Sequence, residues 1–405
     1  MSDAPSPDDD PERRAFAAHC ASWLAAHTPE PPPFALPATP LEVQTEQQLE
    51  WLRAWQRACW QAELVGCDVP REYGGHGRRG LQATATRALA ARGAPFLVNL
   101  VALQMACPTI LAHGSDAQKR RFVPGCLSAD EIWCQGFSEP NAGSDLANVQ
   151  ARATLRDGVW RVDGHKVWTT LARFADWMIL LARTEPDAQK HAGLTYFLCP
   201  IKGQRGVTVR PLVKLTGELG FNEVLFDDVE LADELRLDER GRGWQVAMTT
   251  LLHERGAADS AGGGLAVPAA QLDALVALAR RVERGGRPAI EDPWVRDRIV
   301  SLMITARGLA ANAERAREPA LCDHPLRLPL QAKVLTTEWA QALAHLGMEL
   351  QGAAGALSAA DPSAGDGGAW PRAYLGSYGM TIAAGTSEIQ RNILAERVLE
   401  LPRHR

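Results

Sequence analysis

The spacing of apolar residues changes twice along the chain, and this change constrains the fold more than any other feature. From about residue 11 to 130, apolar residues such as Phe16 and Cys20 recur at helical spacing. From about 131 to 237 the spacing falls to two, as in strands, and helical spacing returns from Gly243. Helices, then strands, then helices favour segregated layers over alternating βαβ units.

We therefore predict an α+β multidomain fold. Its parts are a disordered acidic tail (1–10), an N-terminal helical domain (11–130), a central β domain (131–237) and a C-terminal four-helix bundle (238–405). The expected bundle helices lie at about 243–284, 292–317, 325–352 and after Gly385, with a loop at about 360–369.

Local signals refine this outline. Ser115 and Gln118 have the spacing of a capping box, which predicts a short helix that stops before Pro124. The pairs Asp157-Gly158 and Asp163-Gly164 lie between alternating residues and predict turns in the β domain.

Composition excludes several classes of protein. The chain has 43 basic and 48 acidic residues with no block of basic ones, which disfavours nucleic-acid binding. Its eight cysteines are scattered without C-x-x-C pairs, and no histidine cluster has zinc-ligand spacing, so we expect no metal site. Because we find no secretory signal and no apolar run that could span a bilayer, we predict a soluble cytoplasmic protein.

Three polar segments are candidate ligand contacts. In Trp133–Asp145 the prolyl and glycyl residues bend the chain, and Ser138 and Ser144 supply hydroxyls that could hold an anionic or heteroaromatic ligand. Gly164–Thr170 ends in Trp168, which could stack on a planar ring. The alternatives are a solvated interdomain turn and a buried core tryptophan.

The third segment, Ile382–Arg391, reads as the start of a helix. Gly385 is followed by Thr386 and Ser387, and Ser387 and Gln390 have capping-box spacing. Free N–H groups at a helix start suit phosphate or carbonyl oxygen. The alternative is an ordinary capped helix.

Together, in this order, these segments resemble the acyl-CoA dehydrogenase family. Val69–Gly75, Pro108–Pro124 and Ala395–Arg403 add further matches, so the resemblance covers about 11–403. It implies a helical domain, a barrel-like β domain and a helical bundle, with FAD bound where they meet. It also implies abstraction of an α-proton by a glutamate, with hydride passing from Cβ to flavin N5.

The resemblance assigns roles residue by residue. By position, the flavin contacts are Phe137, Ser138, Ser144, Trp168, Thr169, Thr170, Thr386 and Glu388. Ser144 and Arg255 are expected to contact the substrate. The implied partners are an acyl-CoA, an electron-transfer flavoprotein as electron acceptor, and either further copies of this chain or a paralogue.

The chain departs from the commonest family pattern at the catalytic base. Where Tyr-Glu-Gly-Thr-Ser is usual, Ala384 stands at the glutamate position and cannot take a proton. A branch that includes isovaleryl-CoA dehydrogenases carries its base in a Glu-Arg pair on the first bundle helix, and this chain has Glu254 and Arg255 there. We therefore predict that Glu254 is the base and that the backbone N–H of Ala384 binds the thioester oxygen.

A second departure affects the adenine half of FAD. Many relatives carry Arg-x-x-Phe-Gly, which reaches the FAD of a neighbouring subunit, whereas Val282 and Gly285 occupy those positions here. Arg281 or Arg284 could substitute, and the usual Gln-x-x-Gly-Gly is altered to Gln351–Gly355.

Three alternatives to an acyl-CoA dehydrogenase stay open at this point. Flavin on this fold can reduce O2 in an oxidase or monooxygenase, which needs no α-carbon base. The chain could be a non-catalytic partner subunit, with Ala384 marking lost activity. The acyl group could also be bound to a carrier protein instead of CoA.

Overall fold

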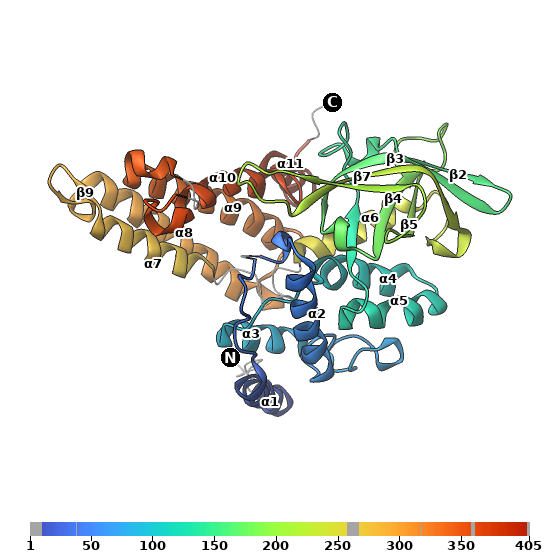
Figure 1. The fold of residues 1–405 in the computed structure, drawn as a ribbon, viewed down its shortest axis with the longest axis horizontal. Coiled ribbons are helices and arrows are strands. Elements are labelled where there is room, and N and C mark those ends of the chain that lie inside the picture. Colours follow the sequence, from blue (N-terminus) through green and yellow to red (C-terminus); the bar gives the residue numbers. More distant parts are fainter. Residues whose placement is uncertain (1–9, 38, 257–266, 317, 358–360, 403–405) are drawn as a thin grey trace. The chain divides into compact units, whose positions relative to one another are not determined.

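The computed structural model describes residues 10–37, 39–256, 267–316, 318–357 and 361–402 (Figure 1). These residues form two compact units, Met1–Gly262 and Gly263–Arg405, which we describe separately. None of the described helices is both long and apolar enough to cross a membrane. All eight cysteines are free thiols.

The first unit begins with helices packed around an apolar core. They are α1 (Pro11–His27), α2 (Glu46–Gln61), α3 (Gln82–Arg92), α4 (Cys107–His113) and α5 (Asp116–Ser128). The predicted capping box of α5 is present, because Ser115 and Gln118 each accept a hydrogen bond from the other's backbone N–H. The predicted stop before Pro124 is wrong. Burial of Val123, Cys126 and Leu127 fixes the last turn and outweighs the proline penalty of about 3 kcal/mol.

The central strands form one eight-stranded, mostly antiparallel sheet. Its path runs β6-β7-β3-β2-β4-β5-β8, with β1 paired in parallel to β4. The strands are β1 (Trp133–Gly136), β2 (Arg152–Arg156), β3 (Val159–Thr170), β4 (Trp177–Arg183), β5 (Leu194–Pro200), β6 (Val207–Leu212), β7 (Phe221–Ala232) and β8 (Arg236–Leu237).

Only one of the two Asp-Gly pairs makes a turn. Asp157 and Gly158, with φ of 50° and 80°, connect β2 to β3. Asp163 and Gly164 lie inside β3, where the pairing with β7 shifts register. A Cβ at Gly164 would lie 2.5 Å from the Cβ of Ala151, so this glycine permits a close approach between chain segments.

The helix α6 (Gly243–Gly256) completes the first unit. It packs against α4 and β5, and Val246, Ala247 and Thr250 are fully buried. The sequence predicted continuous helical periodicity from 243 to 284. The part of that segment at 257–266 lies outside the described residues.

The second unit is a helical bundle. It contains α7 (Val267–Arg281), α8 (Pro293–Arg315), α9 (Arg327–Gln351), α10 (Ala369–Ile382) and the short α11 (Ser387–Ile393). The helix α10 was not predicted. It is held by packing against α9, where a Cβ on Gly347 would lie 2.0 Å from the ring of Trp370. Only a glycine at 347 lets this indole lie against the α9 backbone.

A buried ion pair fixes the loop after β1 to the middle of β3. Lys166 Nζ donates to Glu139 Oε1 at 2.8 Å and to the Phe137 carbonyl at 3.0 Å. Glu139 also accepts from the backbone N–H groups of Gln150 and Ala151 at 2.6 and 2.9 Å. Burial lowers the pKa of Lys166 to about 8, and the Glu139 carboxylate opposes this shift. Four bonds thus join three segments at one point.

We predict that Lys166→Met destabilises the protein by about 3–5 kcal/mol, because it leaves a buried carboxylate without its cation. The measurement is chemical denaturation. Lys202→Met is the control, since Lys202 is 71% exposed beside Asp176 and should change stability by less than about 0.5 kcal/mol. Equal effects of the two variants would contradict this role of the ion pair.

Candidate active site

The loop after β1 is attached to β3 through its backbone, and the side chains of Phe137 and Ser138 are buried and half-buried. Phe137 is 4% exposed and packs edge-on against Tyr196, with ring centroids 5.8 Å apart. The Ser138 carbonyl accepts from the Val167 N–H at 2.9 Å, and the Ser138 side chain is half-buried. Ser144 lies farther along the loop and is exposed. The loop is therefore fastened to β3 beside Trp168, as the proposed roles of these segments require.

Trp168 is exposed on a strained backbone. Its φ of 59° lies in the left-handed region, at a register shift between Lys166 and Thr169. The side chain is 60% exposed and meets Phe221 edge-on at 6.1 Å. The alternative of a buried core tryptophan is therefore wrong. A bulky residue in this conformation costs about 1–3 kcal/mol and is typical of ligand contacts.

The residue after Trp168, Thr169, carries a buried hydroxyl group. Thr169 is fully buried, and its Oγ1 has no hydrogen-bond partner among the described residues. Asn222 donates to the Thr169 carbonyl at 3.0 Å, while its own Oδ1 is also unpartnered in the described part of the chain. Thr170 is half-buried and pairs with Phe221. Buried polar atoms left unpaired cost free energy, so a ligand with donors and acceptors would stabilise this strand end.

In the second unit, Ala384 and Gly385 make the turn that starts α11. Their φ values are 55° and 89°, and Gln390 Nε2 donates to the Ala384 carbonyl at 2.6 Å. The helix cap is Thr386, whose hydroxyl accepts from the Ile389 N–H at 3.2 Å. The capping box expected from Ser387 and Gln390 is therefore not the cap of this helix, because Thr386 caps it one residue earlier and the third helical residue, Ile389, cannot return a side-chain bond.

A pocket of about 300 Å³ lies beside this turn, between α9, α10 and α11. Thr386, Ser387 and Glu388 line it together with Glu338 of α9. Glu388 is exposed, and its own backbone N–H and the Thr386 hydroxyl lower the pKa of its carboxyl. This helix start has the polar groups that a cofactor contact needs.

Glu254 lies near the C-terminal end of α6. It is half-buried and follows the fully buried Thr250 by four residues, so both lie on the same helix face. The side chain of Arg255 lies outside the described residues. Glu254 belongs to the first unit and Ala384 to the second.

The altered segment between α7 and α8 forms a hairpin. Its strands are β9 (Glu283–Arg284) and β10 (Arg287–Pro288), joined by Gly285 and Gly286 with φ of 62° and 77°. The side chain of Val282, at the motif's arginine position, packs against the bundle core.

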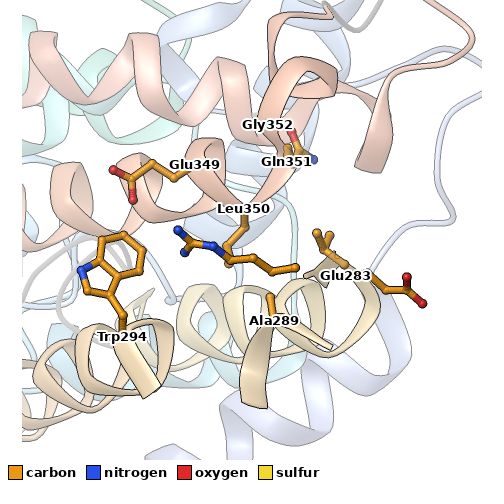
Figure 2. Close-up of a pocket in the computed structure, with 9 residues that line it drawn as sticks. Glu283, Ala289, Trp294, Glu349, Leu350, Gln351 and Gly352 are labelled. Carbon is orange, nitrogen blue, oxygen red and sulfur yellow. The ribbon is translucent and has the colours of Figure 1, made fainter. Parts of the chain in front are cut away.

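A pocket of about 530 Å³ lies beside this hairpin (Figure 2). Figure 2 shows Trp294 and Glu349 on one side of the pocket and Glu283 on the opposite side. The lining includes two carboxylates, those of Glu283 and Glu349, and Glu349 pairs with Arg298.

Both arginines that could substitute for the missing motif already have acidic partners. Arg281 binds both carboxylate oxygens of Asp366 at 2.7 Å. Arg284 lies 3.5 Å from Asp292, with its guanidinium 4.9 Å from the Trp294 ring centroid. Of the two, only Arg284 lines the pocket, where it is accompanied by the carboxylates of Glu283 and Glu349, so the lining offers a pyrophosphate no net positive charge.

Family models match the chain in three consecutive parts. The acyl-CoA dehydrogenase N-terminal, middle and C-terminal domains match residues 35–130, 134–229 and 241–399. The chain belongs to the acyl-CoA dehydrogenase family, and the predicted fold class is confirmed. It is an enzyme of this class, and the members of the family are FAD-dependent flavoproteins.

Individual relatives are similar over nearly the whole length. The acyl-CoA dehydrogenase IpdE1 of Mycobacterium tuberculosis is 40% identical over 88% of this chain and 90% of its own. The ChsE4–ChsE5 complex from the same organism is 28% identical, with a TM-score of 0.76 over 100% of both chains. The Tcur3481–Tcur3483 steroid acyl-CoA dehydrogenase is 25% identical, with a TM-score of 0.78 over 98% and 99% of the two chains.

The end of β3 fits the flavin half of FAD. Trp168 offers an exposed aromatic face, and the Thr169 hydroxyl, for which the described residues supply no partner, offers a donor and an acceptor. These are the groups that bind the face and the edge of a heteroaromatic ring.

We predict that Trp168→Asn weakens FAD binding up to about tenfold, because it removes a stacking surface worth about 0.5–1.5 kcal/mol. Asparagine adopts the left-handed conformation readily, so the apoprotein should be no less stable. Fluorescence titration with FAD and thermal melting measure the two effects. Leu155→Asn, at an exposed position of β2, is the control. Wild-type FAD affinity in Trp168→Asn would refute the contact.

Proposed function

We propose that this protein oxidises the Cα–Cβ bond of an acyl-CoA to give the 2-enoyl-CoA, with Glu254 as the base. The observation that carries the proposal is the combination of Ala384 at the usual base position with a half-buried glutamate on the inward face of α6. When FAD is bound, it accepts the hydride from Cβ. The remaining chemistry is removal of the α-proton.

A carboxylate at Glu254 suits this step. A general base near its substrate contributes about 10² to 10⁴ in rate. Two ionised carboxylates in one small site would repel each other, so an alanine at 384 agrees with a base supplied from another helix. This arrangement resembles that of the isovaleryl-CoA dehydrogenase branch.

The other assignments follow the same proposal. The Ala384 N–H donates to the thioester oxygen, and one such donor is worth about 10² to 10³ in rate. Ser144 and Arg255 contact the substrate, while Thr386 and Glu388 contact the cofactor. The electron acceptor that we propose for the enzyme is an electron-transfer flavoprotein. The eight free thiols agree with a reducing compartment, and we place the enzyme in the cytoplasm.

For the substrate we propose a bulky polycyclic acyl-CoA. One structural relative is a steroid acyl-CoA dehydrogenase. The discriminating experiment is anaerobic bleaching of the flavin with butyryl-, octanoyl-, palmitoyl- and steroid side-chain CoA thioesters. Fastest bleaching by a linear acyl-CoA would overturn this choice of substrate without affecting the reaction type.

We predict that Glu254→Gln keeps FAD and acyl-CoA binding but slows flavin reduction by at least about 10²-fold, because the amide cannot take the α-proton. Anaerobic stopped-flow absorbance with the most active thioester measures the rate. Adding Ala384→Glu to this variant should restore part of it, since the common family position then carries a base. A wild-type rate in Glu254→Gln would show that the base lies elsewhere.

We also propose assembly with a paralogue. The ChsE4–ChsE5 relative is a complex of two differently named proteins, and the carboxylate partners of Arg281 and Arg284 suit a subunit that does not complete its neighbour's FAD site. Such an arrangement needs a second chain with the usual motif.

We predict that the purified chain forms a dimer or tetramer, or associates with a paralogue, and that alone it holds less than one FAD per chain. Light scattering combined with flavin absorbance measures both quantities. An active, fully FAD-loaded monomer would contradict the proposed assembly.

A further inference from the structure

Two adjacent threonines fasten α6 to the rest of the first unit. Thr250 Oγ1 lies 3.0 Å from Thr109 Oγ1 of α4 and 2.9 Å from the Tyr196 hydroxyl of β5. Thr249 Oγ1 lies 2.9 Å from Nε2 of His113, at the end of α4. These are side-chain contacts between elements far apart in sequence, so they fix the helix in three dimensions.

The contacts of Thr250 with Thr109 and Tyr196 are fully buried. Thr109, Thr250 and Tyr196 have no exposed surface, and burial raises the pKa of the Tyr196 phenol, which therefore stays neutral. Apolar residues of the same size would fill this space too. The three hydroxyls add direction, because hydrogen bonds between buried groups hold only over a narrow range of distance and angle.

The contact of Thr249 with His113 continues to the carboxylate of Asp238. Nδ1 of His113 lies 2.9 Å from Asp238 Oδ2, just beyond β8. Partial burial acts to raise the pKa of Asp238, but bonds from the Glu239 N–H and from His113 outweigh it and lower that pKa. Asp238 is thus ionised and accepts the bond from Nδ1, which fixes the imidazole ring that meets Thr249.

The two sets of contacts reach α6 at Thr249 and Thr250, about one turn before Glu254. Four residues of helix span about 6 Å, so Thr250 and Glu254 are neighbours on one face. A tilt of α6 at this point would move the carboxylate directly. Displacement of a catalytic group by about 1 Å can cost 10²-fold in rate.

We propose that Thr249 and Thr250 are positioning residues that hold the last turn of α6, so that Glu254 meets the α-proton. His113, Asp238, Thr109 and Tyr196 act through them. This inference rests on the proposed function, in which Glu254 is the base.

The test uses Thr249→Val and Thr250→Val in the FAD-loaded holoenzyme. Each variant keeps the side-chain shape and removes the hydroxyl. With the most active thioester of the panel above, flavin reduction should slow about 5- to 100-fold, while FAD content and acyl-CoA affinity stay at wild-type values. The isotope effect with the α-deuterated thioester should rise, because proton removal becomes more limiting. Thr249→Ser and Thr250→Ser should recover most of the rate.

The matched control is Thr305→Val on α8, whose hydroxyl returns to the Ser301 carbonyl of its own helix at 3.1 Å. Its flavin reduction should match that of the wild type. Thermal melting of all variants separates slow reduction from unfolding, and the serine variants keep the test usable if a valine variant does not fold.

A double-mutant cycle separates this inference from the proposed function. In the Glu254→Gln background, Thr249→Val should slow reduction by less than about twofold, because the group it positions is already gone. A wild-type rate in Glu254→Gln overturns the proposed function. If Glu254→Gln is slow, the proposed function stands and Thr249→Val decides the positioning role. That role is overturned if Thr249→Val has no effect on the wild-type rate, or if it slows the wild type and Glu254→Gln equally.

Discussion

The buried pair of Lys166 and Glu139 is the interaction on which the part of the candidate site in the first unit depends. It joins the loop after β1, the two residues before β2 and the middle of β3 through four hydrogen bonds to two buried charged groups. Burying two charges is costly unless their remaining donors and acceptors are also bonded, and here the Phe137 carbonyl and two backbone N–H groups meet that need. The loop that carries Ser138 therefore has one position relative to β3.

The strand continues from this fixed point into the strained end of β3. Trp168 adopts a left-handed backbone only two residues after Lys166, and the buried Thr169 hydroxyl has no partner within the part of the chain that the structure describes. Neither feature stabilises the apoprotein. Local strain and unpaired polar atoms persist where the surrounding structure is rigid enough to impose them, and the ion pair supplies that rigidity at the end of β3.

In the second unit, the charged groups near the hairpin between α7 and α8 are paired with each other, whereas polar groups at the start of α11 line a pocket. Arg281 and Arg284, on either side of the start of the 281–288 hairpin, pair with Asp366 and Asp292, so these two charges already have partners within the bundle. The start of α11 keeps polar groups around an open pocket. These two features agree with the proposal that the start of α11 contacts the cofactor and that a partner chain supplies the contact expected at the 281–288 segment.

The sequence by itself determined the order of helices and strands, the family and the polar segments, because periodicity and motifs are local properties. It also indicated Glu254 and the altered 281–288 segment, through the departures from a known pattern. It did not predict α10, the passage of α5 through Pro124 or the role of Gly164, since each depends on the packing of residues distant in the chain. The exposure of Trp168, the contact of Lys166 with Glu139 and the attachment of α6 through Thr249 and Thr250 were decided only by the tertiary structure. Buried hydrogen bonds and close packing act between elements that spacing along the sequence does not relate.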